Sequence, residues 1–190
     1  MDTSKAIKER RSVQHYKKEV PDQEKIMKII QAATWAPSAG NEQPWKYIIV
    51  TEQEKRKRIA MLCEQEWMSQ APVYIVVCGQ TKTLVEHYGE KGYMYNIQSC
   101  AAAIQSMLLE AHNLGLATCW VGHMDEVGVA SELEIKDAHL QAIVTVGFAA
   151  QTKEASRKPL YTSIYFEKWA NTERKTDLFP LEETLKRFKK

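Results

Sequence analysis

Apolar side chains along this chain of 190 residues fall into short runs that alternate with longer, more polar segments. Four of the runs are compact, continuous and rich in β-branched residues, which predicts strands rather than helices. The expected strands cover residues 45–51, 71–79, 117–122 and 140–149. Because strands of a half-exposed sheet alternate apolar and polar residues, these unbroken runs predict a sheet that is covered on both faces.

The segments between the strands carry helical signals. Thr3 or Ser4 can cap a short helix that runs to Glu9. A second helix is expected between Pro21 and Pro37, since its apolar residues have the spacing of one buried stripe. Further helices are expected at residues 52–68, at 92–114 and around Val129, Leu133 and Ile135. Strands alternating with helices predict a mixed α/β or α+β domain.

The helix expected at residues 92–114 has an unusual composition. It is rich in alanine and almost uncharged, and Gly115 follows it as a stop signal. A helix without a polar face is typically buried on more than one side. We therefore expect it to pack against a second copy of the chain as well as against its own sheet.

The last forty or so residues differ in character from the rest. Segment 151–190 is polar, with isolated aromatic residues and too few apolar ones for a core of its own. Such a tail is either disordered or docked on a neighbouring subunit, and the aromatic residues favour docking. We predict one domain spanning residues 1–190, in which residues 151–190 pack on the partner.

Bulk composition narrows the function classes. The 26 Lys and Arg residues nearly balance the 24 Asp and Glu residues, so nucleic acid is not expected as a partner. No apolar run approaches the roughly 18 residues of a membrane span, and the N-terminus lacks the apolar core of an export signal. The four cysteines form no CxxC pair and no metal-ligand pattern, which indicates a reducing, cytoplasmic setting and no metal site.

Two basic segments could bind an anion. Arg10, Arg11 and Ser12 combine two guanidinium groups with a hydroxyl group, as a phosphate receptor does. The alternative is a solvated turn, because cations are favoured after a helix C-terminus in any case. Arg157 and Lys158 form a second basic cluster, which could equally be a pair of surface charges.

Two further segments could approach a flat ligand. The loop from Pro37 to Trp45 offers small residues together with the amides of Asn41 and Gln43, although an ordinary proline-bounded loop would look the same. Segment 118–123 reads as a strand that ends at Gly122, where backbone N–H groups could face a ligand; a plain core strand is the alternative. The chain contains no GxSxG, HExxH or GxGxxG motif, and no side chain stands out as a catalytic acid or base.

Taken together, the segments resemble the nitroreductase family of FMN-dependent oxidoreductases. The matching stretches are residues 10–14 (RRSVQ), 36–45 (APSAGNEQPW), 114–122 (LGLATCWVG) and 157–160 (RKPL), of which the second is the most specific. The resemblance implies an α+β fold with a central sheet flanked by helices. It also implies an intertwined homodimer with an extended C-terminal segment and one FMN at each of two interface sites.

The resemblance also assigns roles to residues. Arg10, Ser12 and Arg157, with Lys158 beside it, would hold the phosphate, while Arg11 and Gln14 would lie nearer the ribityl chain or the ring. Pro37, Ser38, Ala39 and Asn41 would cover the isoalloxazine from the other subunit, and Val121 and Gly122 would bring backbone N–H groups close to flavin N5. Family members often carry Arg or Lys where this chain has Gln14, so its flavin is expected to be harder to reduce.

The implied activity is transfer of hydride from NADH or NADPH to flavin N5, followed by reduction of an electron-poor acceptor such as a nitroaromatic or a quinone in the same site. The flavin performs this chemistry and no protein residue is expected to be catalytic. Segment 81–95 is where we expect the acceptor pocket. Two alternatives remain open: a specialised flavin enzyme, such as a dehydrogenase or dehalogenase, and a flavin-binding protein without turnover.

Overall fold

The computed structural model describes residues 2–152 and 154–173, and the chain divides into two compact units after residue 153. The larger unit contains an antiparallel sheet in the order β1-β2-β4-β3. Its strands are β1 (Trp45–Val50), β2 (Val73–Gly79), β3 (Ala117–Val121) and β4 (His139–Gly147). Each of the four expected strands is therefore present, with ends that differ from the expected ones by at most two residues.

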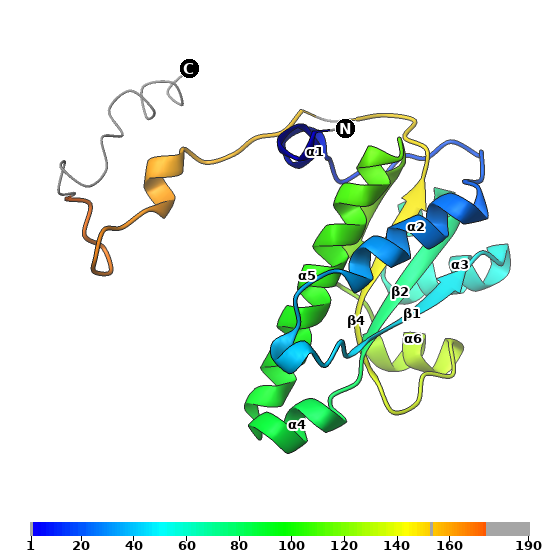
Figure 1. Ribbon diagram of the computed structural model, residues 1–190. Helices are drawn as coiled ribbons and strands as arrows, with labels where there is room; N and C mark the ends of the chain where they lie inside the picture. Colours follow the sequence, from blue (N-terminus) through cyan, green and yellow to red (C-terminus); the bar gives the residue numbers. More distant parts are fainter. Residues whose placement is uncertain (1, 153, 174–190) are drawn as a thin grey trace. The chain divides into compact units, whose positions relative to one another are not determined.

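Helices cover both faces of this sheet. They are α1 (Thr3–Glu9), α2 (Gln23–Thr34), α3 (Gln53–Leu62), α4 (Lys82–Tyr88), α5 (Lys91–Asn113) and α6 (Glu126–Glu132), with 3-10 turns η1 (Ala39–Asn41) and η2 (Glu66–Gln70). Figure 1 shows α2 and α5 together on one side of the strands. One buried cluster joins α2 and α5 to the sheet, and a second joins α3, η2 and α6 to it. The predicted α+β class and the sheet covered on both faces are confirmed.

The central strand β2 shows why the apolar run of residues 71–79 must be a core strand. Every residue of β2 is buried, since alternate side chains enter the two clusters. Its partner β4 contains a bulge, because Val77 pairs with Ala142 but Cys78 pairs with Leu140. Gln141 is the extra residue, and bulges of this kind redirect side chains at the end of a sheet.

The helix α5 ends as its sequence predicts. Gly115 adopts a φ of 75°, its N–H donates to the carbonyl of His112 at 3.0 Å, and the N–H of Leu116 donates to the carbonyl of Ala111 at 2.8 Å. These two bonds form a Schellman motif, which needs a left-handed residue at the position of Gly115. One face of α5 is buried against the sheet, while Tyr93, Met94 and Ile97 remain exposed in the single chain.

The prediction of a single helix at residues 52–68 is wrong. Helix α3 ends at Leu62, Glu64 takes a φ of 53°, and the chain continues as η2. The carbonyl of Leu62 instead accepts a hydrogen bond from the backbone N–H of Asp125 at 2.7 Å. This tertiary contact satisfies a helix-end carbonyl, so the break needs no glycine or proline in the sequence.

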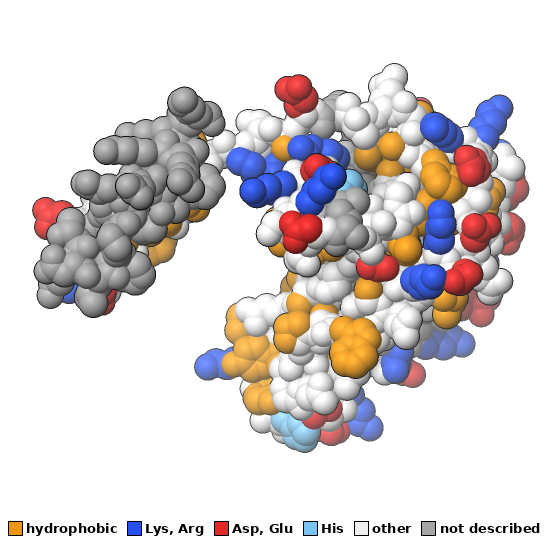
Figure 2. Space-filling view, turned by 45° about the horizontal axis from the view of Figure 1, so that its top comes forward, with side chains coloured by type: hydrophobic (Ala, Val, Ile, Leu, Met, Phe, Trp, Pro, Cys, Tyr) orange, Lys and Arg blue, Asp and Glu red, His pale blue; other side chains and the backbone are white. Residues whose placement is uncertain are grey.

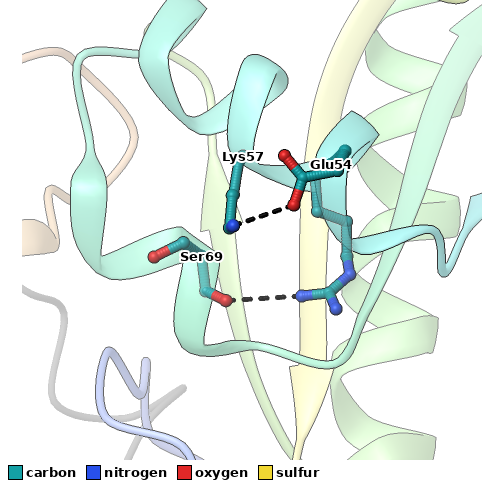
Figure 3. A network of polar contacts seen from close by, with 4 residues as sticks. Glu54, Lys57 and Ser69 are labelled. Carbon is teal, nitrogen blue, oxygen red and sulfur yellow. Dashed lines mark hydrogen bonds and ion pairs between the residues drawn. The ribbon is translucent and has the colours of Figure 1, made fainter.

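Polar contacts link α3 to the turn that follows it. Lys57 pairs with Glu54 on the same helix at 2.8 Å, and Arg56 donates to the carbonyl of Ser69 at 3.3 Å (Figure 3). Arg56 also donates to the carbonyls of Thr51 and Ala71. The guanidinium group thus ties the start of α3 to the end of η2.

The smaller unit is described by residues 154–173. It contains a 3-10 turn, η3 (Leu160–Ser163), and an edge-to-face contact between Tyr165 and Trp169 with ring centroids 5.2 Å apart. Tyr161, Tyr165 and Trp169 are exposed within this unit. The predicted packing of residues 151–190 on a partner remains a prediction, and residues 174–190 lie outside the described part. Among the described helices, none combines the length and the apolar character needed to cross a membrane.

Candidate functional site

The segment after α1 is held along the edge of the sheet. Ser12 forms a parallel bridge with Thr118 of β3, and the N–H of Val13 donates to the carbonyl of Thr118 at 2.9 Å. Further along, Tyr16 bridges to Ala149 just beyond β4. The Tyr16 hydroxyl forms a buried hydrogen bond of 2.8 Å with the Thr145 hydroxyl. These anchors fix the backbone that carries Arg10, Ser12 and Gln14.

Arg10 and Ser12 face the same point on β3. Burial raises the pKa of the Cys119 thiol, while a hydrogen bond with Ser12 and the charge of Arg10 oppose that shift. The Ser12 hydroxyl thus bonds to the Cys119 thiol, and the Arg10 charge acts on the same group. A hydroxyl donor and a guanidinium group on one short segment fit a phosphate, because charge-assisted hydrogen bonds favour an anion.

A cavity of about 300 Å³ lies beside these residues. Its lining includes Arg10, Arg11, His112, Thr118 and Thr152. The Arg11 guanidinium folds back onto the end of α1, where it donates to the carbonyls of Lys8 at 2.6 Å and Arg10 at 2.8 Å. Figure 2 shows several Lys and Arg side chains, with Asp and Glu side chains among them, on one face of the larger unit. The cavity thus combines two arginines and the carboxylate of Glu9 with apolar walls.

His112 is a residue of this cavity that the sequence did not indicate. Its Nε2 atom is buried and has no hydrogen-bond partner among the described residues. It lies on the last turn of α5, whose position over the start of β3 is a tertiary arrangement. A single histidine in an apolar helix forms no sequence motif, so its position in the cavity could not be predicted from the sequence.

The loop between α2 and β1 is held in an unusual conformation. Gly40 and Asn41 both have a φ of 58°, and Gln43 has a φ of 49°. The N–H of Gln43 donates to the Ser38 hydroxyl at 3.0 Å, and the N–H of Ala39 donates to the Ser99 hydroxyl at 3.3 Å. Left-handed backbone is tolerated by Gly and Asn but is costly for Gln, so the loop is held by its surroundings.

Within one chain, the loop and the Arg10 cavity lie apart. The loop contacts α5 at Ser99, whereas the cavity touches α5 at His112. These positions are separated by roughly 20 Å along the helix at the standard rise per residue. A single copy of the larger unit therefore does not bring Ser38, Ala39 and Asn41 to the phosphate-side residues.

The end of β3 is accessible at Gly122. Val121 is buried and Gly122 is exposed, and a Cβ added at Gly122 would come near only the Trp120 indole nitrogen, at 3.8 Å. A flat group could therefore approach the backbone here. Arg157 and Lys158 belong to the smaller unit, where both are exposed and Arg157 donates to the carbonyl of Ser156 at 2.7 Å.

The segment expected to form an acceptor pocket contains α4, which the sequence did not predict. Tyr88 at its end packs edge-to-face on Tyr95, with ring centroids 5.2 Å apart. A second cavity, of about 340 Å³, lies beyond it and is lined by Thr81, Tyr93, Asn96, Glu126, His139 and Gln141. The described residues contain no group of His, Cys, Asp and Glu side chains arranged to hold a metal ion.

Comparison with known proteins decides the family. A sequence model of the nitroreductase family matches residues 7–67 and 60–148. The chain belongs to the nitroreductase family. A relative from Methanothermobacter thermautotrophicus, provisionally named NADH dehydrogenase/NAD(P)H nitroreductase, is 40% identical over 124 residues, which are 64% of this chain and 61% of the relative. The match thus spans less than two thirds of that relative's length.

Solved structures of nitroreductase-family proteins share the fold. One from Parabacteroides distasonis has a TM-score of 0.78 at 28% identity, with 88% of this chain and 98% of that one covered. Another, a provisionally named nitroreductase from Desulfovibrio desulfuricans, was solved in complex with FMN; it gives a TM-score of 0.78 at 26% identity over 89% of this chain and 98% of that one. The expected fold family is confirmed.

Proposed function

We propose that this chain is an FMN-dependent oxidoreductase that accepts electrons from NADH or NADPH and passes them to a small electron-poor acceptor, such as a nitroaromatic or a quinone. The observation that carries the proposal is the pairing of Ser12 with Thr118 of β3, which places Arg10 at a cavity of about 300 Å³. Membership of the nitroreductase family and the FMN complex of the Desulfovibrio desulfuricans relative support it.

The residues present fit the phosphate side of FMN. Arg10 and Ser12 would hold the phosphate as charged and neutral donors, and Arg157 and Lys158 would add positive charge. Arg11 supports them by fixing the end of α1, since its guanidinium group bonds to the Lys8 and Arg10 carbonyls. These donors together would favour a dianionic phosphate.

The residues around the end of β3 fit the ring. The open backbone at Gly122 would approach flavin N5, and Gln14 would offer an amide to the ring or the ribityl chain. Bound FMN supplies the acceptance and release of hydride, which no side chain of this protein provides. The protein's own task is to orient the ring and to keep water from it.

The proposed enzyme is a homodimer. The loop of Ser38, Ala39 and Asn41 meets α5 at Ser99, roughly 20 Å along the helix from His112 in the Arg10 cavity. A second copy is therefore the natural source of the loop that covers the ring, together with Pro37. The exposed Tyr93, Met94 and Ile97 give α5 an apolar surface for this contact. Isologous contacts of this kind are the commonest in soluble dimers. All four cysteines are free, which agrees with the cytoplasmic location that we propose.

The test begins with the purified full-length protein. A yellow protein with a flavin spectrum, or one that takes up added FMN at one per chain, supports the proposal; a colourless protein that refuses FMN overturns it. Anaerobic titration with NADH and then NADPH should bleach the flavin, and a quinone should restore it. Flavin reduction without turnover would instead favour a flavin-binding protein, while turnover with halogenated or saturated substrates alone would favour a specialised flavin enzyme.

A further inference from the structure

Helix α4 lies directly against the loop that contains Ser38 to Glu42. The position that a Cβ would occupy at Gly40 is only 2.7 Å from the Tyr88 hydroxyl, so a side chain at residue 40 would displace Tyr88. One residue earlier on the helix, His87 Nδ1 lies 3.1 Å from Glu42 Oε1. Two consecutive residues of α4 thus contact the loop on either side of Asn41.

The helix is itself fixed to α5, so these contacts have a rigid base. A Cβ at Gly92 would lie 2.5 to 2.6 Å from the backbone of Leu84 and Val85, which shows how closely the two helices approach. Leu84 is fully buried, and the Tyr88 ring packs on Tyr95. Tyr88 is partly exposed, and its ring is positioned by this edge-to-face contact with Tyr95.

The loop needs such support because its backbone is strained at Gln43. A left-handed conformation is costly for Gln and persists only where the surroundings enforce it. Ser99 holds the loop from the α5 side by accepting from the N–H of Ala39 while donating to the carbonyl of Tyr95. Tyr88 and His87 hold it from the α4 side.

We propose that α4 is a clasp on this loop, in which Tyr88 and His87 act as positioning residues for the contact that Ser38, Ala39 and Asn41 make with the flavin ring. The inference rests on the proposed function, since that function assigns the loop to the ring. Figure 2 shows hydrophobic side chains gathered on the lobe that carries α4 and the start of α5. Loss of the contacts that Tyr88 and His87 make with the loop would loosen the loop over the flavin ring and leave the phosphate-side residues unchanged.

Hydrogen–deuterium exchange of the full-length protein tests the clasp without requiring FMN. Tyr88→Ala should raise the exchange rate of the amides of residues 38–43 by about tenfold or more, because it removes the packed ring. His87→Gln should raise it by about two- to fivefold, since an exposed polar contact between two side chains is weak. The control is Glu86→Gln, which alters the charge of the adjacent exposed residue and should leave these amides unchanged.

Two further variants separate the clasp from a general loss of structure. His87→Lys places a cation within reach of Glu42 and should restore the protection that His87→Gln loses. Glu42→Gln should have no further effect in the His87→Gln background if the two residues act only through each other. If Tyr88→Ala fails to fold, this cycle and Tyr88→Phe, which keeps the ring, still decide the question.

The same variants should raise the rate of FMN dissociation by factors that follow the exchange results. If the wild-type protein binds no FMN, the proposed function fails, yet loop exchange in the free protein still reports on the clasp. If FMN binds and loop exchange is the same in the wild type, Tyr88→Ala and His87→Gln, the clasp is overturned and the proposed function stands.

Discussion

Ser12 and Thr118 form an isolated parallel bridge that joins the segment after α1 to β3, although the two residues lie far apart in the chain. The bridge sets the geometry of the candidate site, because Arg10 and Gln14 are each two residues from Ser12. A ligand that contacts both the Arg10 side chain and the backbone at the end of β3 must therefore extend along β3, which is an edge strand of the sheet.

The first prediction concerns the phosphate side. Arg10→Ala should weaken FMN binding by about 10- to 100-fold, since a hydrogen bond to a charged group contributes about 1.5–3 kcal/mol. Fluorescence titration of the stripped protein at two salt concentrations measures both the affinity and its salt dependence, and the latter should also fall. Lys8→Ala is the control, because Lys8 lies on the same turn of α1 and contributes only its backbone carbonyl to the site. Equal losses of FMN affinity in the two variants would show that Arg10 acts only through the overall positive charge of this surface.

The second prediction concerns the anchor of the same segment. Tyr16→Phe should lower the free energy of unfolding by about 1 kcal/mol, because the hydroxyl of Thr145 loses its buried partner. Thr145→Val should cost more, since Thr145 also donates to the carbonyl of Cys119 at 3.4 Å. Urea unfolding of both single variants and the double variant should give a coupling of about 0.5–1.5 kcal/mol. Strict additivity would mean that this hydrogen bond contributes nothing.

The third prediction contrasts two neighbouring cations of α3. Arg56→Ala should destabilise the protein by about 2 kcal/mol, because the guanidinium group donates to three backbone carbonyls that link α3, β1 and η2. Lys57→Ala should cost less than about 0.5 kcal/mol, since its ion pair with Glu54 is exposed on one helix (Figure 3). Thermal unfolding of both variants checks the difference. A larger loss at Lys57 than at Arg56 would contradict this account.

The sequence predicted those parts of the fold whose signals are local. The stripe on α2 and the apolar run of β2 report their own burial, and Gly115 marks the end of α5. The break at Glu64 was missed because it depends on the contact between Leu62 and Asp125, which no local pattern encodes.

The candidate site was predictable as a set of segments but not as a geometry. The pairing of Ser12 with Thr118 is long-range, and the place of His112 beside it follows from how α5 crosses the sheet. Helix α4 was missed because only Leu84 of its seven residues is buried, so its sequence lacks an apolar stripe. Its position depends on the absence of a side chain at Gly92.

The fourth prediction is a loss of stability in alkali. Burial raises the pKa of the Cys63 and Cys78 thiols to about 11 and that of Cys100 to about 12. Each folded value exceeds the unfolded one, so the unfolded state loses its proton first, and the stabilisation falls as the pH rises above about 9. Each thiol should contribute a slope of up to about 1.4 kcal/mol per pH unit in that range. Urea unfolding at pH 8, 9 and 10 measures this slope, and Cys100→Ala should make the free energy of unfolding depend less steeply on pH.

The fifth prediction concerns the flavin potential. Gln14 is exposed between the buried Val13 and the anchored Tyr16, so a longer side chain at this position does not disturb the core. Gln14→Arg should raise the midpoint potential of bound FMN, because a cation stabilises the anionic reduced flavin. A charge pair about 4 Å apart in water is worth about 1 kcal/mol, which corresponds to on the order of 20 mV for a two-electron couple. Potentiometric titration measures the shift, with Gln14→Leu as the uncharged control. A potential that is unchanged or lower in Gln14→Arg would mean that residue 14 does not face the ring.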